Sequence, residues 1–323
     1  MTTKQMISLV IPVYRSGEIL PELHGRLTNV FAAHPDGYEV IFVEDCGGDN
    51  SWDVIQTLVA NDTHVRGIRM SRNYGQHNAL LCGILAAYGE VVITLDDDMQ
   101  HPPEELPKLL DKLNEGHDVV YGPPIRQQHG VMRDLASYAT KLALQSAMGA
   151  ENARQVGSLR AFRTDLRRAF TDYRSPTVSI DVLLAWATSR FASVPVQHEP
   201  RRSGESGYTV GKLIRHAFNM MTGFSTQPLQ IASMMGFLFA LFGVGVFVYV
   251  LLQVLIQGSP VPGFPFLASI ISIFSGAQLL ALGIMGEYLA RMHFRTMERP
   301  PYLVRDEIGA PIDPVKVAAL AED

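Results

Sequence analysis

The sequence predicts an α/β domain built on a mostly parallel sheet, followed by a hairpin of two membrane-spanning helices. Three observations carry this prediction. Short apolar runs alternate with helix-like segments over the N-terminal third of the chain. The apolar run 91–95 ends in three consecutive aspartates, and two long uncharged segments follow nearer the C-terminal end. The chain has 323 residues, which is enough for one large or two modest domains.

The alternation of strands and helices defines the first domain. Strands are predicted over 7–13, 39–43, 65–70, 91–95 and 118–121, and helices over 18–33, 52–60, 78–88 and 104–113. Farther along, helices are predicted over 131–148, 165–172 and 179–189, and strands over 156–162 and 192–198. Strands separated by helices at this spacing favour parallel pairing with right-handed crossovers. The acidic loops after Val43 and after Leu95 should therefore lie at the same edge of the sheet, where a nucleotide can be held between them.

The loop after Leu95 is the strongest candidate for a metal site. Asp96, Asp98 and Gln100 alternate, so an extended backbone would point all three side chains the same way. Oxygen ligands of this kind suit a hard divalent cation such as Mg²⁺ or Mn²⁺. The alternative is a solvated acidic loop. The apolar strand before the acids and the double proline after them, at 102–103, favour the metal site.

A long uncharged window near the C-terminal end predicts the membrane hairpin. No Asp, Glu, Lys or Arg stands between Arg215 and Glu287. The apolar runs 229–256 and 266–289 each exceed the roughly 20 residues that cross a bilayer. A buried core hairpin, the alternative, would need two helices that are apolar on every face. Basic residues flank both runs, so the positive-inside rule places the flanks in the cytoplasm and the linker 257–265 outside.

These features divide the chain into four parts. We expect a cytoplasmic catalytic domain over 1–207, an amphipathic interfacial helix over 208–226, two membrane spans within 227–290, and a cytoplasmic tail over 291–323. The net charge of −5 argues against nucleic acid as a partner. Cys46 and Cys82 are far apart and outside any CxxC pattern, which speaks against a disulfide scaffold or zinc site. The N-terminus leads straight into a strand and carries no recognisable signal peptide.

Five motifs, in this order and followed by paired spans, resemble the GT-A-type inverting glycosyltransferases, in particular the polyisoprenyl-phosphate glycosyltransferases. The motifs are Val10–Tyr14, Val43–Asp45, Arg72–His77, Leu95–Glu104 and Arg201–Ser206. The likeness runs from about Ser8 to Tyr302. It implies a Rossmann-like GT-A domain and inverting, metal-dependent transfer of a sugar from a nucleotide sugar, expected to be UDP-linked by family proximity, to a polyprenyl phosphate such as undecaprenyl phosphate. It also implies a multi-pass protein of the bacterial inner membrane and is compatible with a homo-oligomer.

The resemblance assigns roles to residues by position. The residues that match nucleotide-sugar-binding positions are Pro12, Tyr14, Asp45, Asp96 and Asp97. Asp96, Asp98 and Gln100 match the metal site, and Arg126, Arg133 and Ser137 match positions near the acceptor phosphate. The residues assigned to catalysis are Asp98, Arg133, Arg201 and Arg202. The chain departs from the family pattern where Arg15-Ser16 replaces the usual Asn-Glu and Gly207 replaces a lysine.

Two other functions stay open at this point. A lipid phosphate has a second pKa of about 6, so it is largely dianionic at pH 7 and needs no strong general base. A saccharide or protein hydroxyl would need one, and Asp181 is then the candidate. The other alternative is a catalytically silent, membrane-tethered binder of nucleotide sugars. His77 and His101 are expected to make structural hydrogen bonds. The sequence does not identify the sugar, and it leaves both uracil and guanine open.

Overall fold

The computed structural model describes residues 6–32, 34, 37–125, 156–175, 178–199, 227–257, 263–297 and 299–309. The chain forms two compact units, one of residues 1–209 with 298–323 and one of residues 210–297. Five of the predicted site residues lie outside the described residues, and so do the predicted helices 131–148 and 208–226. These site residues are Arg126, Arg133, Ser137, Arg201 and Arg202.

An eight-stranded mixed sheet is the centre of the first unit. In spatial order its strands are β7 (Phe191–Ser193), β5 (Val119–Tyr121), β6 (Arg160–Arg163), β4 (Val91–Thr94), β1 (Ile7–Val13), β2 (Tyr38–Glu44), β3 (Val65–Met70) and β8 (Val304–Ile308). Strands β4, β1, β2 and β3 pair in parallel, whereas β6 is antiparallel to both of its neighbours and β8 is antiparallel to β3. The predicted α/β class with a mostly parallel sheet is confirmed.

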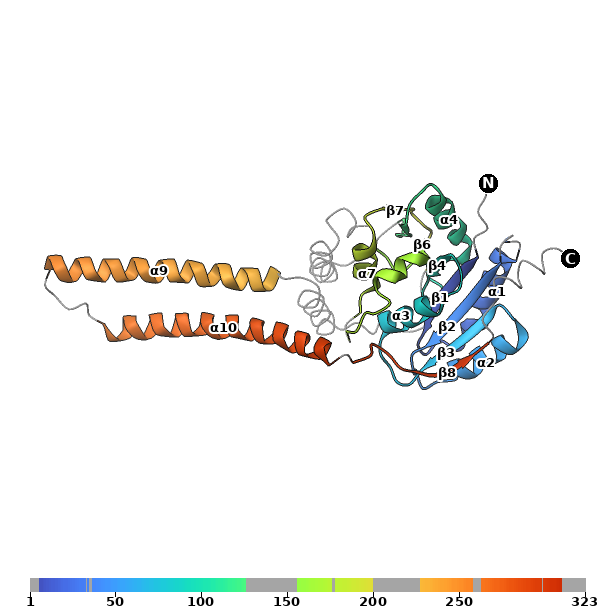
Figure 1. Ribbon diagram of the computed structural model, residues 1–323, viewed down its shortest axis with the longest axis horizontal. Coiled ribbons are helices and arrows are strands. Elements are labelled where there is room, and N and C mark those ends of the chain that lie inside the picture. Colours follow the sequence, from blue (N-terminus) through green and yellow to red (C-terminus); the bar gives the residue numbers. More distant parts are fainter. Residues whose placement is uncertain are drawn as a thin grey trace. The chain divides into compact units, whose positions relative to one another are not determined.

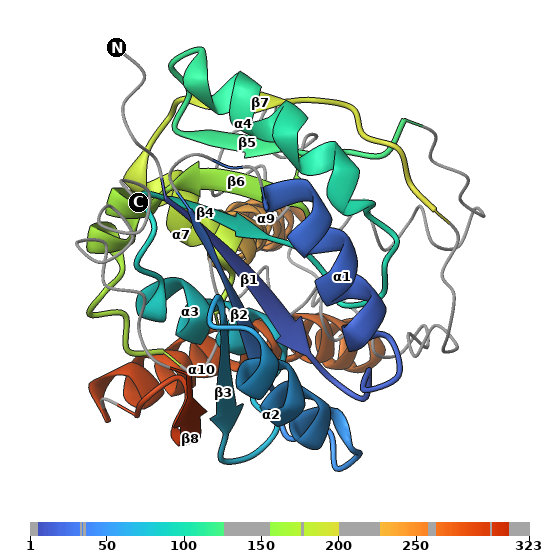
Figure 2. The same cartoon turned by 90° about the vertical axis from the view of Figure 1, so that its right-hand side faces the viewer.

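Helices cover both faces of this sheet (Figure 2). One face carries α1 (Leu20–Phe31), α2 (Ser51–Asn61), the 3₁₀ turn η1 (Pro103–Glu105) and α4 (Leu106–Asn114); the other carries α3 (Gln76–Ala86), η2 (Thr164–Ala169) and α7 (Ile180–Ala187). Alternate side chains of β1 serve the two layers: Leu9 and Ile11 pack with the first, and Val10 packs with the second. A strand buried on both sides must be apolar throughout, which is why 7–13 reads as a continuous apolar run.

Gly83 lets α3 lie unusually close to the sheet. A Cβ at this position would stand 2.4 Å from Cγ1 of Val10 and 3.0 Å from Cγ2 of Val43. Any larger side chain would push the helix away from β1 and β2. The close approach fixes the N-terminal end of α3, including Gln76, beside the carboxyl ends of the central strands.

The structure corrects several predicted elements. The strand expected over 156–162 is the short β6 at Arg160–Arg163, and the helix expected over 165–172 is the 3₁₀ turn η2. The strand expected over 192–198 reduces to β7 and an isolated bridge between Pro124 and Val196. Strand β8, in the tail after the apolar helices, was not predicted at all. Its register pairs Gly67 with Ile308 and Ile68 with Glu307, so the tail completes one edge of the sheet.

The second unit contains two long apolar helices, α9 (Gln227–Gln257) and α10 (Phe264–Thr296), which lie side by side (Figure 1). Their candidate spans, Leu229–Val246 and Ile273–His293, have mean hydropathies of 1.9 and 1.3, and none of either window is buried. Phe237 is 64% exposed and Leu279 is 69% exposed. A buried core hairpin is therefore the wrong interpretation, and the exposed apolar surface fits a membrane hairpin.

Candidate functional site

The candidate site lies where the strand order reverses, at the carboxyl ends of β1, β2 and β4. Strand β1 has β2 on one side and β4 on the other, and all three run in the same direction. The loops after β2 and β4 therefore leave the sheet at the same edge, as the sequence predicted, and they lie on either side of the loop after β1. Such a reversal opens a crevice in which α/β proteins bind ligands.

Backbone strain marks the loops that follow all three strands. Among the described residues, the non-glycine residues with positive φ are Arg15 (58°) after β1, Cys46 (53°) after β2 and Met99 (60°) after β4. Such conformations are costly and persist where surrounding contacts enforce them, commonly at ligand sites. Arg15 is held by a hydrogen bond of 2.9 Å from its Nε to the carbonyl oxygen of Gly47, which joins the first loop to the second.

Asp97 joins the loop after β4 to the loop after β1. Its Oδ2 accepts a hydrogen bond of 3.1 Å from the backbone N–H of Tyr14 and one of 2.5 Å from Oγ of Ser16. Burial raises the pKa of Asp97 to about 6, and the charges of Asp96 and Asp98 also raise it, while the two hydrogen bonds work the other way. Ser16 thus has a defined structural task, because it joins the loop after β1 to Asp97. A contact between Asp97 and the nucleotide stays a prediction.

The three proposed metal ligands do not lie on an extended strand. Asp97 and Asp98 form a turn after β4, and Met99 is left-handed, so the expected alternation of side chains is wrong. Asp96 accepts a hydrogen bond of 2.5 Å from Nε2 of Gln76, and Asp98 accepts one of 3.1 Å from the backbone N–H of Gln100. The turn still gathers the oxygen-bearing side chains of Asp96, Asp98 and Gln100 within one short loop, all of them partly exposed.

Histidine and cysteine do not complete this loop as a metal centre. Within the described ranges, no group of three or more His, Cys, Asp or Glu side chains is arranged to hold a metal ion. The proposed ligand set contains two carboxylates and one amide, so it depends on Gln100 as the third donor. A site with two carboxylates and additional neutral oxygens is a common arrangement for Mg²⁺. This ion also keeps water and substrate phosphate among its ligands.

Asp45 fixes the polar turn that leads into α3. Its two carboxylate oxygens accept hydrogen bonds of 2.7 Å each from the backbone N–H groups of Tyr74 and Gly75. Burial raises the pKa of Asp45, although these hydrogen bonds favour its charged form. This polar turn also positions Gln76 against Asp96. The sequence identified 72–77 as a motif, but only the structure shows that it joins the two acidic loops.

The other two predicted nucleotide contacts differ in exposure. Tyr14 is 46% exposed at the end of β1, and the guanidinium of Arg15 lies 5.3 Å from its ring centroid. Pro12 is buried within β1 and pairs in register with Val43. Tyr14 is thus exposed after β1 with a guanidinium over its ring, whereas Pro12 belongs to the buried strand. Their roles in nucleotide binding stay predictions.

Residues 198–199, which precede the Arg201–Ser206 motif (the basic loop), contact the acidic loop after β4. The N–H of Glu199 donates to the carbonyl oxygen of Gln100 at 2.9 Å, and the ring of His198 meets that of His101 edge-on, with centroids 5.0 Å apart. His101 is 8% exposed, and its Nδ1 makes no hydrogen bond within the part of the chain that the structure describes. The hydrogen bond expected for His101 is therefore not seen at that atom, and ring packing holds it instead. Burial lowers the pKa of His101 to about 4, so it stays neutral.

Asp181, the candidate general base for a hydroxyl acceptor, is engaged elsewhere. It is 6% exposed, lies 2.8 Å from Nη1 of Arg160 in an ion pair, and accepts a hydrogen bond of 3.1 Å from the hydroxyl of Tyr121. His77 makes the structural hydrogen bond that was expected, since its Nδ1 accepts the N–H of Ile180 at 3.4 Å. The neighbourhood of Asp181 therefore has the character of a buried structural network.

Comparison with known proteins gives matches along most of the chain. Residues 8–169 match the family described as "Glycosyl transferase family 2". An undecaprenyl-phosphate 4-deoxy-4-formamido-L-arabinose transferase of Shewanella sediminis (strain HAW-EB3) is 36% identical over 303 residues, which cover 93% of this chain and 92% of the relative. The transferase of the same name from Yersinia pestis (strain Pestoides F) is 34% identical over 308 residues, 94% of each chain.

One solved structure shares the fold at low sequence identity. It is glucosyl-3-phosphoglycerate synthase from Mycobacterium tuberculosis in complex with Mn²⁺, uridine diphosphate and glucosyl-3-phosphoglycerate. The TM-score is 0.52 at 16% identity, over 68% of this chain and 79% of that chain. The likeness supports a common fold for the first unit.

Proposed function

Because the chain belongs to glycosyl transferase family 2, we propose that it transfers a sugar from a nucleotide sugar to undecaprenyl phosphate in a membrane. The observation that carries the proposal is the identity of 34–36% with transferases of that name along more than nine-tenths of the chain, which includes both apolar helices. The first donor to test is a UDP-linked 4-deoxy-4-formamido-L-arabinose. UDP-linked hexoses and GDP-linked sugars are the alternatives.

The acidic loop fits a divalent cation by its donor chemistry. Asp96 and Asp98 offer carboxylate oxygens and Gln100 offers an amide oxygen, and all three stand in one short loop at the crevice. These residues would hold Mg²⁺ or Mn²⁺, which when bound supplies positive charge for the diphosphate leaving group. Asp45 uses two of its roughly four acceptor positions for backbone N–H groups, so it can also accept from a nucleotide base. Tyr14 offers its exposed ring to the same ligand.

The chemical step requires orientation of the acceptor more than proton removal. A phosphate oxygen of the lipid attacks the anomeric carbon and forms a new C–O bond. The bond from that carbon to the nucleoside diphosphate breaks on the opposite side, so the configuration inverts. Planar guanidinium groups match phosphate oxygens. We propose that the acceptor phosphate is bound and oriented in this way by Arg126, Arg133, Arg201 and Arg202, with Ser137 as a further donor. The engagement of Asp181 with Arg160 favours this acceptor over a hydroxyl that needs a base.

Transfer of a radiolabelled sugar tests this function directly. Purified protein is incubated with Mg²⁺, the labelled nucleotide sugar, and either undecaprenyl phosphate or no lipid. We expect the label to enter an organic-extractable, acid-labile product only when the lipid is present. Label in a saccharide or protein would favour the alternative acceptor class. Binding of the nucleotide sugar without transfer to any acceptor would favour the silent binder.

The arrangement in the membrane gives a first prediction. We propose a multi-pass protein of the bacterial inner membrane, with the catalytic unit and the tail in the cytoplasm and 258–263 outside. A cysteine replacing Ser259 should react with a membrane-impermeant thiol reagent in intact cells. A cysteine replacing Ser203, on the catalytic side, should react only after the membrane is opened. Reaction of the second cysteine but not the first in intact cells would invert the topology.

The basic loop gives a second prediction. The hydrogen bond from Glu199 to Gln100 fixes the segment that leads into Arg201 and Arg202 beside the acidic loop. The double variant Arg201→Ala, Arg202→Ala should raise the KM for undecaprenyl phosphate at least about tenfold, because each charge-assisted hydrogen bond contributes roughly 1.5–3 kcal/mol. Calorimetry should show a much smaller change in affinity for the free nucleoside diphosphate. Damage confined to nucleotide binding would assign these arginines to the donor.

A further inference from the structure

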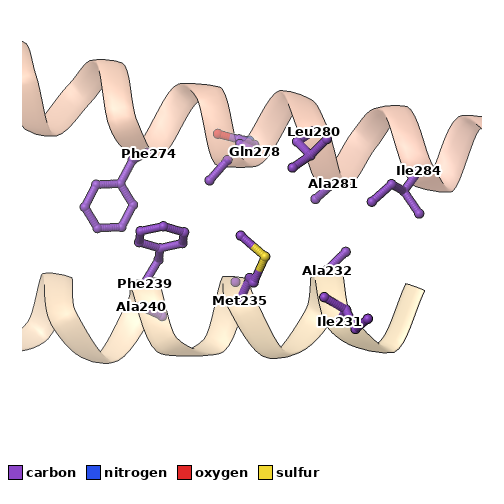
Figure 3. A pocket seen from close by; sticks show the side chains of 12 residues that line it. Ile231, Ala232, Met235, Phe239, Ala240, Phe274, Gln278, Leu280, Ala281 and Ile284 are labelled. Carbon is purple, nitrogen blue, oxygen red and sulfur yellow. The ribbon is translucent and has the colours of Figure 1, made fainter. Parts of the chain in front are cut away.

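An apolar groove runs between the two helices of the second unit (Figure 3). Its volume is about 420 Å³, and its walls come from one stretch of α9, Ile231–Ala240, and one of α10, Phe274–Ile284. Of the described residues that line it, Gln278 has the only polar side chain. The groove is thus a hydrocarbon-lined space with almost no capacity for hydrogen bonding.

The groove exists because large rings separate the helices beside a row of small residues. Phe274 packs against Phe239, with ring centroids 5.5 Å apart, and against Phe242 at 6.5 Å. On one side of this contact, Ala232, Gly236 and Ala240 follow each other at four-residue spacing along α9 and line the groove together with alanines of α10. Small residues usually let membrane helices pack closely. Here the aromatic contact sets the separation, and a Cβ at Gly236 would meet nothing within 4 Å.

We propose that this groove binds part of the isoprenoid chain of the polyprenyl phosphate acceptor. The inference rests on the proposed function, because that function supplies the lipid. The chain of such a lipid is branched hydrocarbon throughout, so it needs no polar partner in the groove. The volume is within the ~300–1,000 Å³ typical of small-molecule sites, which accommodates a portion of a long chain.

The place of the groove along the sequence favours this occupant. Its α9 wall begins a few residues after the start of that helix, and its α10 wall, 274–284, spans the middle of its helix. If the hairpin spans a bilayer, the groove therefore extends from the side that connects to the catalytic unit toward the middle of the bilayer. The phosphate of the acceptor must stand at the membrane surface on that side to react. The isoprene units that follow the first two then reach the depth of the groove.

Two glycines allow a matched test. Both glycines are exposed, and a Cβ on either meets nothing within 4 Å, but Gly236 lines the groove whereas Gly283 on α10 lies outside the lining. The Gly236→Leu side chain would occupy the groove, and Gly283→Leu adds the same apolar bulk elsewhere. We expect Gly236→Leu to raise the KM for undecaprenyl phosphate about tenfold. Its KM for geranyl phosphate, a much shorter acceptor, and its kcat with that acceptor should stay within about twofold of the unmodified protein.

The kinetic outcomes separate the groove from general damage. An equal rise in KM for both acceptors, or an equal rise in both variants, would overturn the proposal. A change in oligomeric state with Gly236→Leu but not with Gly283→Leu would also overturn it, because the groove would then be an interface between copies of the chain. Normal kcat with geranyl phosphate shows that the variant is folded.

A binding measurement separates this inference from the transferase proposal. A polyprenyl phosphate that carries a photoreactive group on an isoprene unit beyond the second is irradiated with the full-length protein in nanodiscs, without donor. We expect cross-links to 231–240 that Gly236→Leu reduces at least about fivefold and that a large excess of phospholipid leaves in place. Cross-links there without any sugar transfer would keep the groove and refute the transferase. Normal transfer with cross-links elsewhere, or displacement by bulk phospholipid, would refute the groove.

Discussion

Replacing Asp98 by asparagine is expected to lower the rate of sugar transfer at least about 100-fold, the scale of losing one electrostatic group that acts in a transition state. The change keeps the shape of the side chain but removes a charged oxygen from the proposed ion site. The amide can still accept the hydrogen bond from the N–H of Gln100, so the turn after β4 should survive. The reduced activity should come with a higher concentration of Mg²⁺ or Mn²⁺ for half-maximal rate.

Transfer kinetics at several metal concentrations check this expectation. Asp53→Asn is the matched control, because Asp53 is exposed on α2 and the same change there should leave the rate within about twofold. Chelation of divalent ions should abolish transfer by the unmodified protein, and added metal should restore it. Near-normal turnover of Asp98→Asn, or transfer that is indifferent to chelation, would remove Asp98 from the metal site.

The second large effect is on stability. It comes from a residue at the end of the strands opposite the candidate site. Arg66→Met is expected to reduce the free energy of unfolding by roughly 3–5 kcal/mol, since it leaves the buried carboxylate of Glu39 without its counter-charge. Arg66 is 2% exposed, and its Nη1 donates to Oε2 of Glu39 at 2.9 Å. Glu39 is fully buried and also accepts hydrogen bonds from Ser8 and from the N–H of Tyr88. A loss of this size is a large part of the ~5–15 kcal/mol that stabilises most proteins.

Denaturant unfolding of the detergent-purified protein measures the effect. Glu307→Gln offers a contrast on the same guanidinium: its carboxylate accepts from Nη2 of Arg66 at 2.8 Å but is half exposed. Losing that exposed charge should cost less than about 1 kcal/mol. Adding Glu39→Gln to Arg66→Met should recover part of the stability, because it removes the unpaired charge. Equal losses from Arg66→Met and Glu307→Gln would contradict the assignment of the stabilising role to the buried pair.

Local sequence patterns determined the frame of this protein. Strands 7–13, 38–44, 65–70 and 91–94 appear close to where the apolar runs predicted them, because strands buried on both faces must be apolar without interruption. The turn chemistry after Leu95 placed the three aspartates at a strand end, and parallel pairing placed the acidic loops at one edge. The absence of charge between Arg215 and Glu287 predicted both apolar helices. Each of these signals lies within a short stretch of chain.

Only the tertiary structure decided how distant segments meet. Strand β8 has the sequence VRDEI and is mostly exposed, so it carries no apolar run, and its place beside β3 depends on partners such as Arg66 and Glu307, 241 residues apart. The contacts of Asp97 with Tyr14 and of Asp45 with Tyr74 likewise join separate loops. The left-handed turn at Met99 replaced the extended strand that the alternation of ligands suggested. Hydrogen bonds between distant loops leave no periodic pattern in the sequence, so only packing of the whole chain determines them.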